Sequence, residues 1–173
     1  MKKILGAVAA SLLLAGTASA APTGTQTVIG SVGAAVDIIV TATSALGPLS
    51  APANSYGTTL LTVNSTDAYT VSVKSTQATM TQWDGSAYVA GVDLNDPLSA
   101  VAVASTDVGS TTTAIGTPSA ARAISTTDQV LFTGTQAESA AKIEVDYTQP
   151  VDWGTPAGDY QIDLTYTIAV SAL

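Results

Sequence analysis

Apolar and polar residues alternate strictly near the end of the chain. From Tyr160 to Val170 every even-numbered position is aromatic or aliphatic, and the positions between them are mostly polar. A period of two is typical of a β-strand with one buried face, because an amphipathic helix repeats its apolar positions every three or four residues. The pattern therefore predicts a long, half-buried strand over residues 160–170.

The same alternation predicts more strands upstream. It is clearest at 142–148, 69–74 and 36–40, and in the last of these Asp37 should point outward. Clusters of Gly, Pro, Asn and Asp separate the candidates, and no segment joins good helix formers to a 3.6-residue apolar period. Short strands with such punctuation indicate two packed sheets, so we expect an all-β, Ig-like Greek-key β-sandwich. Weaker strand candidates lie at 26–32, 58–63, 87–92, 99–104 and 129–133.

Residues 105–128 have the weakest pattern, being polar and low in complexity. We favour a long surface loop for this stretch, which is uncommon in a compact domain and sometimes functional. The alternative is a pair of edge strands around Ala114-Ile115 and Ala123-Ile124.

The start of the chain has the organisation of a secretory signal peptide. Two lysines precede a short apolar stretch, Ile4–Ala15, and a small-residue cleavage site ends at Ala20. The apolar stretch is shorter than the roughly 18–20 residues that a transmembrane helix needs. We therefore expect a signal peptide at 1–20 and a single domain at 21–173. The product should be secreted to the cell surface or beyond, crossing the periplasm if the cell is Gram-negative.

The composition removes most catalytic chemistry. The 173 residues include no His and no Cys, which excludes imidazole bases, thiolate nucleophiles, disulfides and thiolate metal sites. Without residues 1–20, the basic residues would be Lys74, Arg122 and Lys142, against 13 acidic ones. Such a surface should repel nucleic acid and anionic membranes, which bind through basic groups. We expect no cofactor, no membrane insertion and no enzyme activity.

The acidic residues are compatible with two kinds of site, a glycosidase active site and a calcium site, and both hypotheses are weak. Asp93 with Asp96, or Asp152 with Asp159, would supply paired carboxylates for glycoside hydrolysis. Both pairs fall in predicted turns, where Asp is common because its side chain bonds nearby backbone. Asp93, Asn95 and Asp96 also form a weak calcium candidate, since they offer oxygen ligands close together, although their spacing is not that of an EF-hand.

Two further motifs could bind or carry a saccharide. Trp83, Tyr88 and Trp153 are candidates for a ligand platform, although a tryptophan in such a position more often covers the end of a core. Asn64-Ser65-Thr66 is an N-glycosylation sequon. The same three residues are equally consistent with a turn before the strand at Tyr69.

The segment Thr155–Ser171 resembles the closing strand of secreted prokaryotic β-sandwich surface proteins, including spore-coat-U-like and pilus-like subunits. Those proteins often carry a Pro-Ala-Gly-x-Tyr turn before an alternating strand, and Pro156, Ala157, Gly158 and Tyr160 match it. The chain also resembles TasA-like fibre subunits. Gly158 should provide a positive φ at the corner. The Tyr160 hydroxyl should bond the preceding backbone, as in a tyrosine corner.

These observations favour a non-catalytic structural subunit of a surface fibre, pilus-like filament or coat. In the families it resembles, an extended segment of one subunit completes a sheet of the next, so self-association into a homopolymer is expected. The candidate donor is Thr23–Val32, with Val28, Ile29 and Val32 as insertion residues. The alternative is a monomeric secreted module that binds a polysaccharide or a surface partner.

Overall fold

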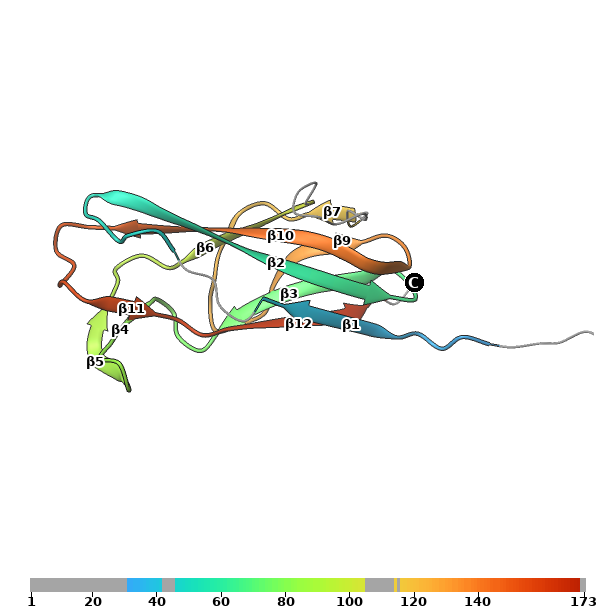
Figure 1. Cartoon of the computed structure of the whole chain (residues 1–173), viewed down its shortest axis with the longest axis horizontal. Helices are drawn as coiled ribbons and strands as arrows, with labels where there is room; N and C mark the ends of the chain where they lie inside the picture. The colour runs from blue at the N-terminus through green and yellow to red at the C-terminus, as the bar shows by residue number, and fades with distance from the viewer. Residues whose placement is uncertain (1–30, 42–45, 105–113, 115, 172–173) are drawn as a thin grey trace, which may run out of the picture. The chain divides into compact units, whose positions relative to one another are not determined.

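Figure 1 shows the computed structural model of the chain, which describes residues 31–41, 46–104, 114 and 116–171. Within these ranges every regular element is a β-strand and every strand pair is antiparallel. Residues from Val32 onward form one compact unit. The chain is therefore all-β in its described part, as the alternation predicts.

The strands form three sheets, with five, four and three members. The five-stranded sheet contains, in order, β1 (Val36–Val40), β2 (Ala53–Ser65), β10 (Glu138–Val151), β6 (Ser99–Ala104) and β8 (Arg122–Ala123). The four-stranded sheet contains β12 (Leu164–Val170), β3 (Tyr69–Ser75), β9 (Gln129–Gly134) and β7 (Gly116–Pro118). The three-stranded sheet contains β11 (Asp159–Gln161), β4 (Thr81–Trp83) and β5 (Tyr88–Asp93).

The two longest strands, β2 and β10, lie side by side in the five-stranded sheet. They pair from Ala53 opposite Val151 to Ser65 opposite Glu138, with a bulge near Ala140. Ala140 has a φ of 52°, and its amide donates to Asn64 Oδ1 at 2.8 Å. A side chain thus supplies the acceptor where the bulge interrupts the ladder.

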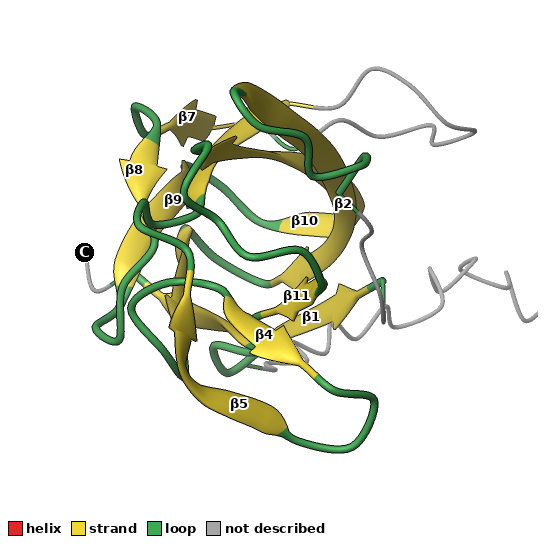
Figure 2. Ribbon diagram, turned by 90° about the vertical axis from the view of Figure 1, so that its left-hand side faces the viewer, coloured by secondary structure: helices red, strands yellow, loops and turns green. Residues whose placement is uncertain are grey.

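One hydrophobic core lies between the five-stranded and the four-stranded sheet. Alternate residues of the inner strands are buried, because successive side chains of a strand point to opposite faces. Two packed faces of this kind are consistent with a β-sandwich, and Figure 2 views the layers from one end. The core includes Leu61, Val63, Ala102, Ile143 and Val145 from one sheet and Tyr69, Val71, Val73 and Phe132 from the other.

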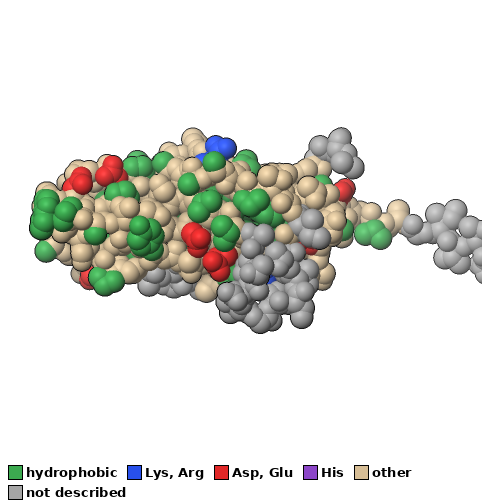
Figure 3. All heavy atoms as spheres, turned by 90° about the horizontal axis from the view of Figure 1, so that it is seen from above, with side chains coloured by type: hydrophobic (Ala, Val, Ile, Leu, Met, Phe, Trp, Pro, Cys, Tyr) green, Lys and Arg blue, Asp and Glu red, His purple; other side chains and the backbone are tan. Residues whose placement is uncertain are grey.

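The surface of the described residues carries few charges. Figure 3 shows one face, on which uncharged polar atoms surround scattered apolar and acidic side chains. Charged residues make up 10% of the chain, so charge gives little protection against edge-to-edge association of strands. The exposed large apolar side chains in the described ranges are Val32, Ile39, Val40, Tyr56, Val130 and Trp153.

Most strands predicted from the alternation are confirmed. Asp37 is exposed on β1, while Val36 and Ile38 on the same strand turn inward and are partly buried. The confirmed predictions at 36–40, 58–63, 69–74, 87–92, 99–104, 129–133 and 142–148 each overlap a strand of the structure.

The predicted strand over 160–170 is two strands in different sheets. β11 ends at Gln161 and pairs with β4, whereas β12 begins at Leu164 and pairs with β3. Between them the Asp163 carboxylate accepts a hydrogen bond from the Tyr88 hydroxyl at 2.7 Å and one from the Gln161 amide at 3.5 Å. The alternation continues through this break, so a pattern of period two does not reveal it.

The loop interpretation of residues 105–128 is wrong for the second half of the stretch. The edge strands β7 and β8 lie there, paired with β9 and β6 respectively. Ile124 is 2% exposed and its amide donates to the Leu98 carbonyl at 2.7 Å, so this part is anchored to the core. Residues 105–113 and 115 lie outside the described ranges.

The predicted signal peptide also lies outside the described residues. So does the predicted strand at 26–32, apart from Ser31 and Val32, which belong to no strand. No helix in the described ranges is long and apolar enough to cross a membrane.

Candidate functional site

The first and last strands of the described chain lie next to each other at the edges of the two large sheets. Among the described residues β1 pairs with β2 alone and β12 pairs with β3 alone, so each strand has one free edge. The large apolar side chains of β12 alternate with small exposed ones but are only partly buried. Val71 and Val73, on the neighbouring β3, are fully buried. The side of the core between the edges of β1 and β12, called the groove below, is therefore less completely covered than the part under β3.

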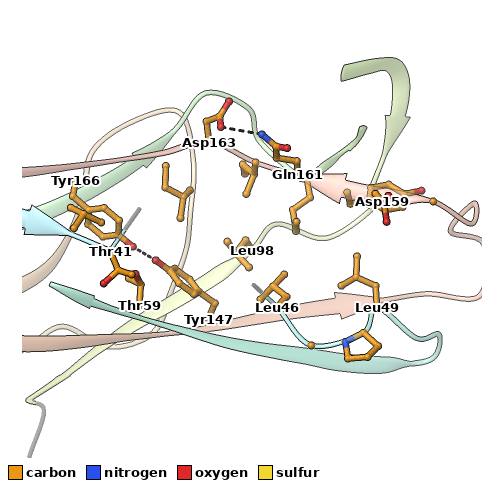
Figure 4. Close-up of a pocket in the computed structure, with 18 residues that line it drawn as sticks. Thr41, Leu46, Leu49, Thr59, Leu98, Tyr147, Asp159, Gln161, Asp163 and Tyr166 are labelled. Atoms are coloured by element: carbon orange, nitrogen blue, oxygen red, sulfur yellow. Dashed lines mark hydrogen bonds between the residues drawn. The ribbon is translucent and has the colours of Figure 1, made fainter. Parts of the chain in front are cut away.

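A cavity of about 820 Å³ lies at the end of β1. Its walls come from the end of β1, from residues 46–49, from Thr59 on β2 and Tyr147 on β10, and from the segment 158–166 that includes β11 and the start of β12. Leu46, Leu49 and Leu98 provide apolar walls, as Figure 4 shows. Asp159 and Asp163 are its charged lining residues, and no lining residue is basic, so the cavity suits an uncharged or cationic occupant.

Two tyrosines from opposite sheets meet at one side of the cavity. The hydroxyls of Tyr147, on β10, and Tyr166, on β12, hydrogen-bond to each other (Figure 4). Burial raises the pKa of Tyr147 to about 12. Burial and the neighbouring Tyr147 also raise the pKa of Tyr166. Both hydroxyls therefore stay protonated at neutral pH and can act as donors or acceptors beside the polar lining residues Thr41 and Thr59.

The turn before β11 closes the other side of the cavity. The Tyr160 hydroxyl donates to the Pro156 carbonyl at 2.9 Å, which confirms the bond predicted from the sequence. Gly158 has a φ of 158°, a positive value that residues with a side chain rarely adopt, which confirms the positive φ predicted at this corner. Space is a second reason for a glycine, because a Cβ at Gly158 would lie 2.1 Å from Gln82 Nε2, which donates to the Ala157 carbonyl at 3.0 Å.

The structure assembles the proposed aromatic platform only in part. Trp83 and Tyr88 pack edge to face with ring centroids 5.1 Å apart and planes at 71°. Burial and the bond to Asp163 raise the pKa of Tyr88. Trp153 lies in the connection between β10 and β11, is 79% exposed, and makes no ring contact with this pair in the described structure. Whether these residues bind a ligand stays a prediction.

The three residues of the calcium hypothesis have separate partners. The Asp93 carboxylate accepts a bond from the Thr81 hydroxyl. Asn95 Nδ2 lies 3.4 Å from an Asp152 oxygen, and the Asp96 carbonyl accepts from Gln149 Nε2 at 3.0 Å. No group of three or more acidic side chains in the described ranges is placed to hold a metal ion. The geometry therefore gives the calcium hypothesis no support.

The side chains of the sequon are used within the fold. The Asn64 amide contacts Asp37 at 3.5 Å and accepts from the Ala140 amide. The Thr66 hydroxyl accepts from the Ala35 amide at 2.7 Å. These bonds give both residues a structural role, and glycosylation at Asn64 stays a prediction.

The proposed donor segment falls almost wholly outside the described residues. Val28 and Ile29 belong to the part that is not described, while Val32 is described and 86% exposed. The cavity and its tyrosine pair were not found from the sequence. The alternation marks Tyr147 and Tyr166 as inward-facing, but it carries no information about which inward residues on different sheets meet.

Comparisons with protein-family models, with curated proteins and with solved structures each gave no match. The class that the geometry defines is an all-β protein with two packed antiparallel sheets. Its distinguishing feature is a cavity of mixed polar and apolar lining near the end of β1 and the start of β12.

Proposed function

We propose that the protein is a non-catalytic extracellular structural subunit that self-associates into a cell-surface fibre, pilus-like filament or coat. After export directed by residues 1–20, the segment Thr23–Val32 of one copy adds as a strand to the groove between β1 and β12 of another copy. The free edge of β12 beside this groove is the observation that carries the proposal.

The strand order supports an Ig-like arrangement with one position left open. In an immunoglobulin sandwich one sheet has the order A-B-E-D, and strand G lies in the second sheet. Here β1-β2-β10-β6 follows A-B-E-D in both spatial and chain order, and β12 follows β10 as F follows E. No described strand pairs with the outer edge of β12, where a strand G would be placed. A strand from a second copy would take that position.

The chemistry of the groove supports the addition of a strand. Backbone groups on the free edges of β1 and β12 provide hydrogen bonds to an added segment of any sequence, while the cavity accepts apolar side chains. The segment Thr23–Val32 carries no charge, and it contains valines and an isoleucine. It therefore brings no negative charge toward the two acidic residues that line the cavity.

The strand proposal is tested by deleting Ala21–Ile29 from the full-length chain while the signal sequence is kept. The exported wild-type protein should form large species in size-exclusion chromatography with light scattering, and fibres in negatively stained micrographs. The deletion variant should remain a monomer, because it has no strand to donate. Assembly that is unchanged by the deletion would rule out this mechanism.

A peptide experiment tests the groove separately. A synthetic peptide of residues 21–32 should bind the deletion variant and raise its melting temperature, because it supplies the absent strand. A matched control peptide carrying Val28→Asp and Ile29→Asp should have little effect, since burying an unpaired carboxylate is costly. Equal effects of the two peptides would contradict specific strand addition.

The packed pair Trp83 and Tyr88 supports a second candidate, a monomeric secreted module that binds a polysaccharide or a surface partner. An aromatic face beside Asp163, as here, can stack on a sugar ring while a carboxylate accepts hydrogen bonds from its hydroxyls. Under this candidate the exported protein stays monomeric, and Trp83→Ala abolishes its retention on an immobilised polysaccharide.

A further inference from the structure

The two most exposed large apolar side chains in the described ranges lie at opposite ends of the same sheet. Val32 is 86% exposed and Trp153 is 79% exposed. The Gly33 carbonyl, next to Val32, lies 3.3 Å from the Thr66 hydroxyl, just past the end of β2. Trp153 follows Val151, which pairs with Ala53 at the start of β2. The whole length of β2 therefore separates them.

The cavity is at the Trp153 end. Its wall residues include Gly158 and Asp159, at the end of the same β10–β11 connection that carries Trp153. In Figure 1 this connection lies at the far left, whereas the chain that leads into β1 lies to the right of that strand. Residues 32–35, which lead into β1, thus lie at the end of the body that is remote from the cavity.

The direction in which a donated strand runs along β12 decides which end of the receiving copy lies next to the body of the donating copy. Every strand pair in the described residues is antiparallel, so we take a strand added to β12 to be antiparallel as well. β12 runs away from the cavity, from Leu164 to Val170. An antiparallel donor therefore runs toward the cavity, and its last residue, Val32, reaches the cavity end of the receiving copy.

The lengths agree with this placement. The ten residues 23–32 span about 33 Å as a strand, at about 3.3 Å per residue. The seven residues of β12 pair with most of the donor, and the remainder extends past Leu164 over the cavity. The body of the donating copy then lies beside the exposed tryptophan.

We propose that Trp153 of the receiving copy packs against Val32 of the donating copy, an inference that rests on the proposed function. This contact joins different surfaces of two identical chains head to tail, and such contacts build open filaments rather than closed dimers. Tryptophan is enriched among the residues that dominate interface energies, because its large ring loses much exposed apolar area on contact.

The experiment uses Trp153 as its own reporter in the exported full chain. Trp83→Phe leaves Trp153 as the one tryptophan. On assembly its fluorescence should shift to shorter wavelength, and its quenching by acrylamide should fall severalfold. Trp153→Ala should raise the concentration at which polymer forms by about tenfold or more. Val130→Ser, which removes another exposed apolar side chain on β9, is the matched control and should leave that concentration unchanged.

The outcomes separate this contact from the assembly itself. Polymer in which Trp153 keeps its water-exposed emission, or in which Trp153→Ala matches the control, overturns the contact and leaves strand addition standing. Wild-type protein that never assembles overturns the proposed function and this contact with it. A blue shift of the monomer on adding hydroxyethyl cellulose, without assembly, also overturns the contact and assigns Trp153 to saccharide binding.

Discussion

The hydroxyl of Tyr147 on β10 hydrogen-bonds to the hydroxyl of Tyr166 on β12, so a polar bond joins the two sheets beside the cavity. Tyr147 is 4% exposed, and Tyr166 packs partly buried against the same core. The pair lies beside the polar lining residues Thr41 and Thr59 (Figure 4). Its energetic role can be measured directly.

Replacing either tyrosine with phenylalanine should destabilise the protein by about 1 kcal/mol, because the other hydroxyl then loses its partner. The double variant Tyr147→Phe/Tyr166→Phe should cost less than the sum of the single changes, since no buried hydroxyl is left alone. Urea denaturation of the four proteins gives the coupling energy. Strictly additive costs would show that the two hydroxyls act independently.

Alkaline pH should destabilise the protein through the same residues. Burial raises the pKa of Tyr147 from 10.0 to about 12, so the folded chain holds its proton more tightly than the unfolded chain does. Stability is then unaffected below pH 10 and falls as the pH rises from 10 to 12, by on the order of 1–2 kcal/mol. Measured free energies of unfolding should fall less steeply in Tyr147→Phe. An equal slope in the variant would place the titration elsewhere, for example at Tyr69, whose pKa burial also raises.

Gly134 at the end of β9 should not tolerate a side chain. A Cβ there would lie 2.1 Å from Cε1 of Tyr69, a fully buried ring that stacks on Phe132. Gly134→Ala should therefore cost about 1–3 kcal/mol by overpacking the core. Gly154→Ala is the matched control, because nothing lies within 4 Å of its Cβ position. Thermal melts of the two variants should differ clearly, and equal melting temperatures would refute the steric argument.

The tyrosine corner should make a modest contribution to stability. Tyr160 is only partly buried, and its hydroxyl bond to the Pro156 carbonyl is solvent-exposed, so water can replace the lost donor in Tyr160→Phe. We expect a cost of about 0.5–1 kcal/mol, at the low end for a hydrogen bond. A loss of more than about 2 kcal/mol in the free energy of unfolding would contradict this expectation. It would mean that Tyr160 stabilises the turn through more than this single hydrogen bond.

The alternation of apolar and polar residues predicts the all-β class because it reports which face of each strand is buried. It correctly orients Val71 on β3 and Val145 on β10, and both are fully buried. It also orients Asp37 outward. These features depend on neighbours in the sequence, where a period of two is informative.

The alternation of apolar and polar residues could not predict features that depend on which strands contact each other. The break at Asp163 arises from bonds to Tyr88 and Gln161, which lie on different strands. The burial of Ile124 depends on its contact with a distant part of the chain. The cavity was missed for the same reason, since Tyr147 and Tyr166 are brought together only by the packing of two sheets. The Tyr160 bond could be predicted because its acceptor is four residues away.

Thr66 clamps the chain where it enters β1. Its hydroxyl accepts from the Ala35 amide at 2.7 Å, and its own amide donates to the Ala35 carbonyl at 2.9 Å. These two bonds tie the residue before β1 to the residue that follows β2, so they hold the entry into β1 against the end of its neighbour. In the polymer that we propose, the same entry would join two copies, so every junction along the fibre would depend on this pair of bonds.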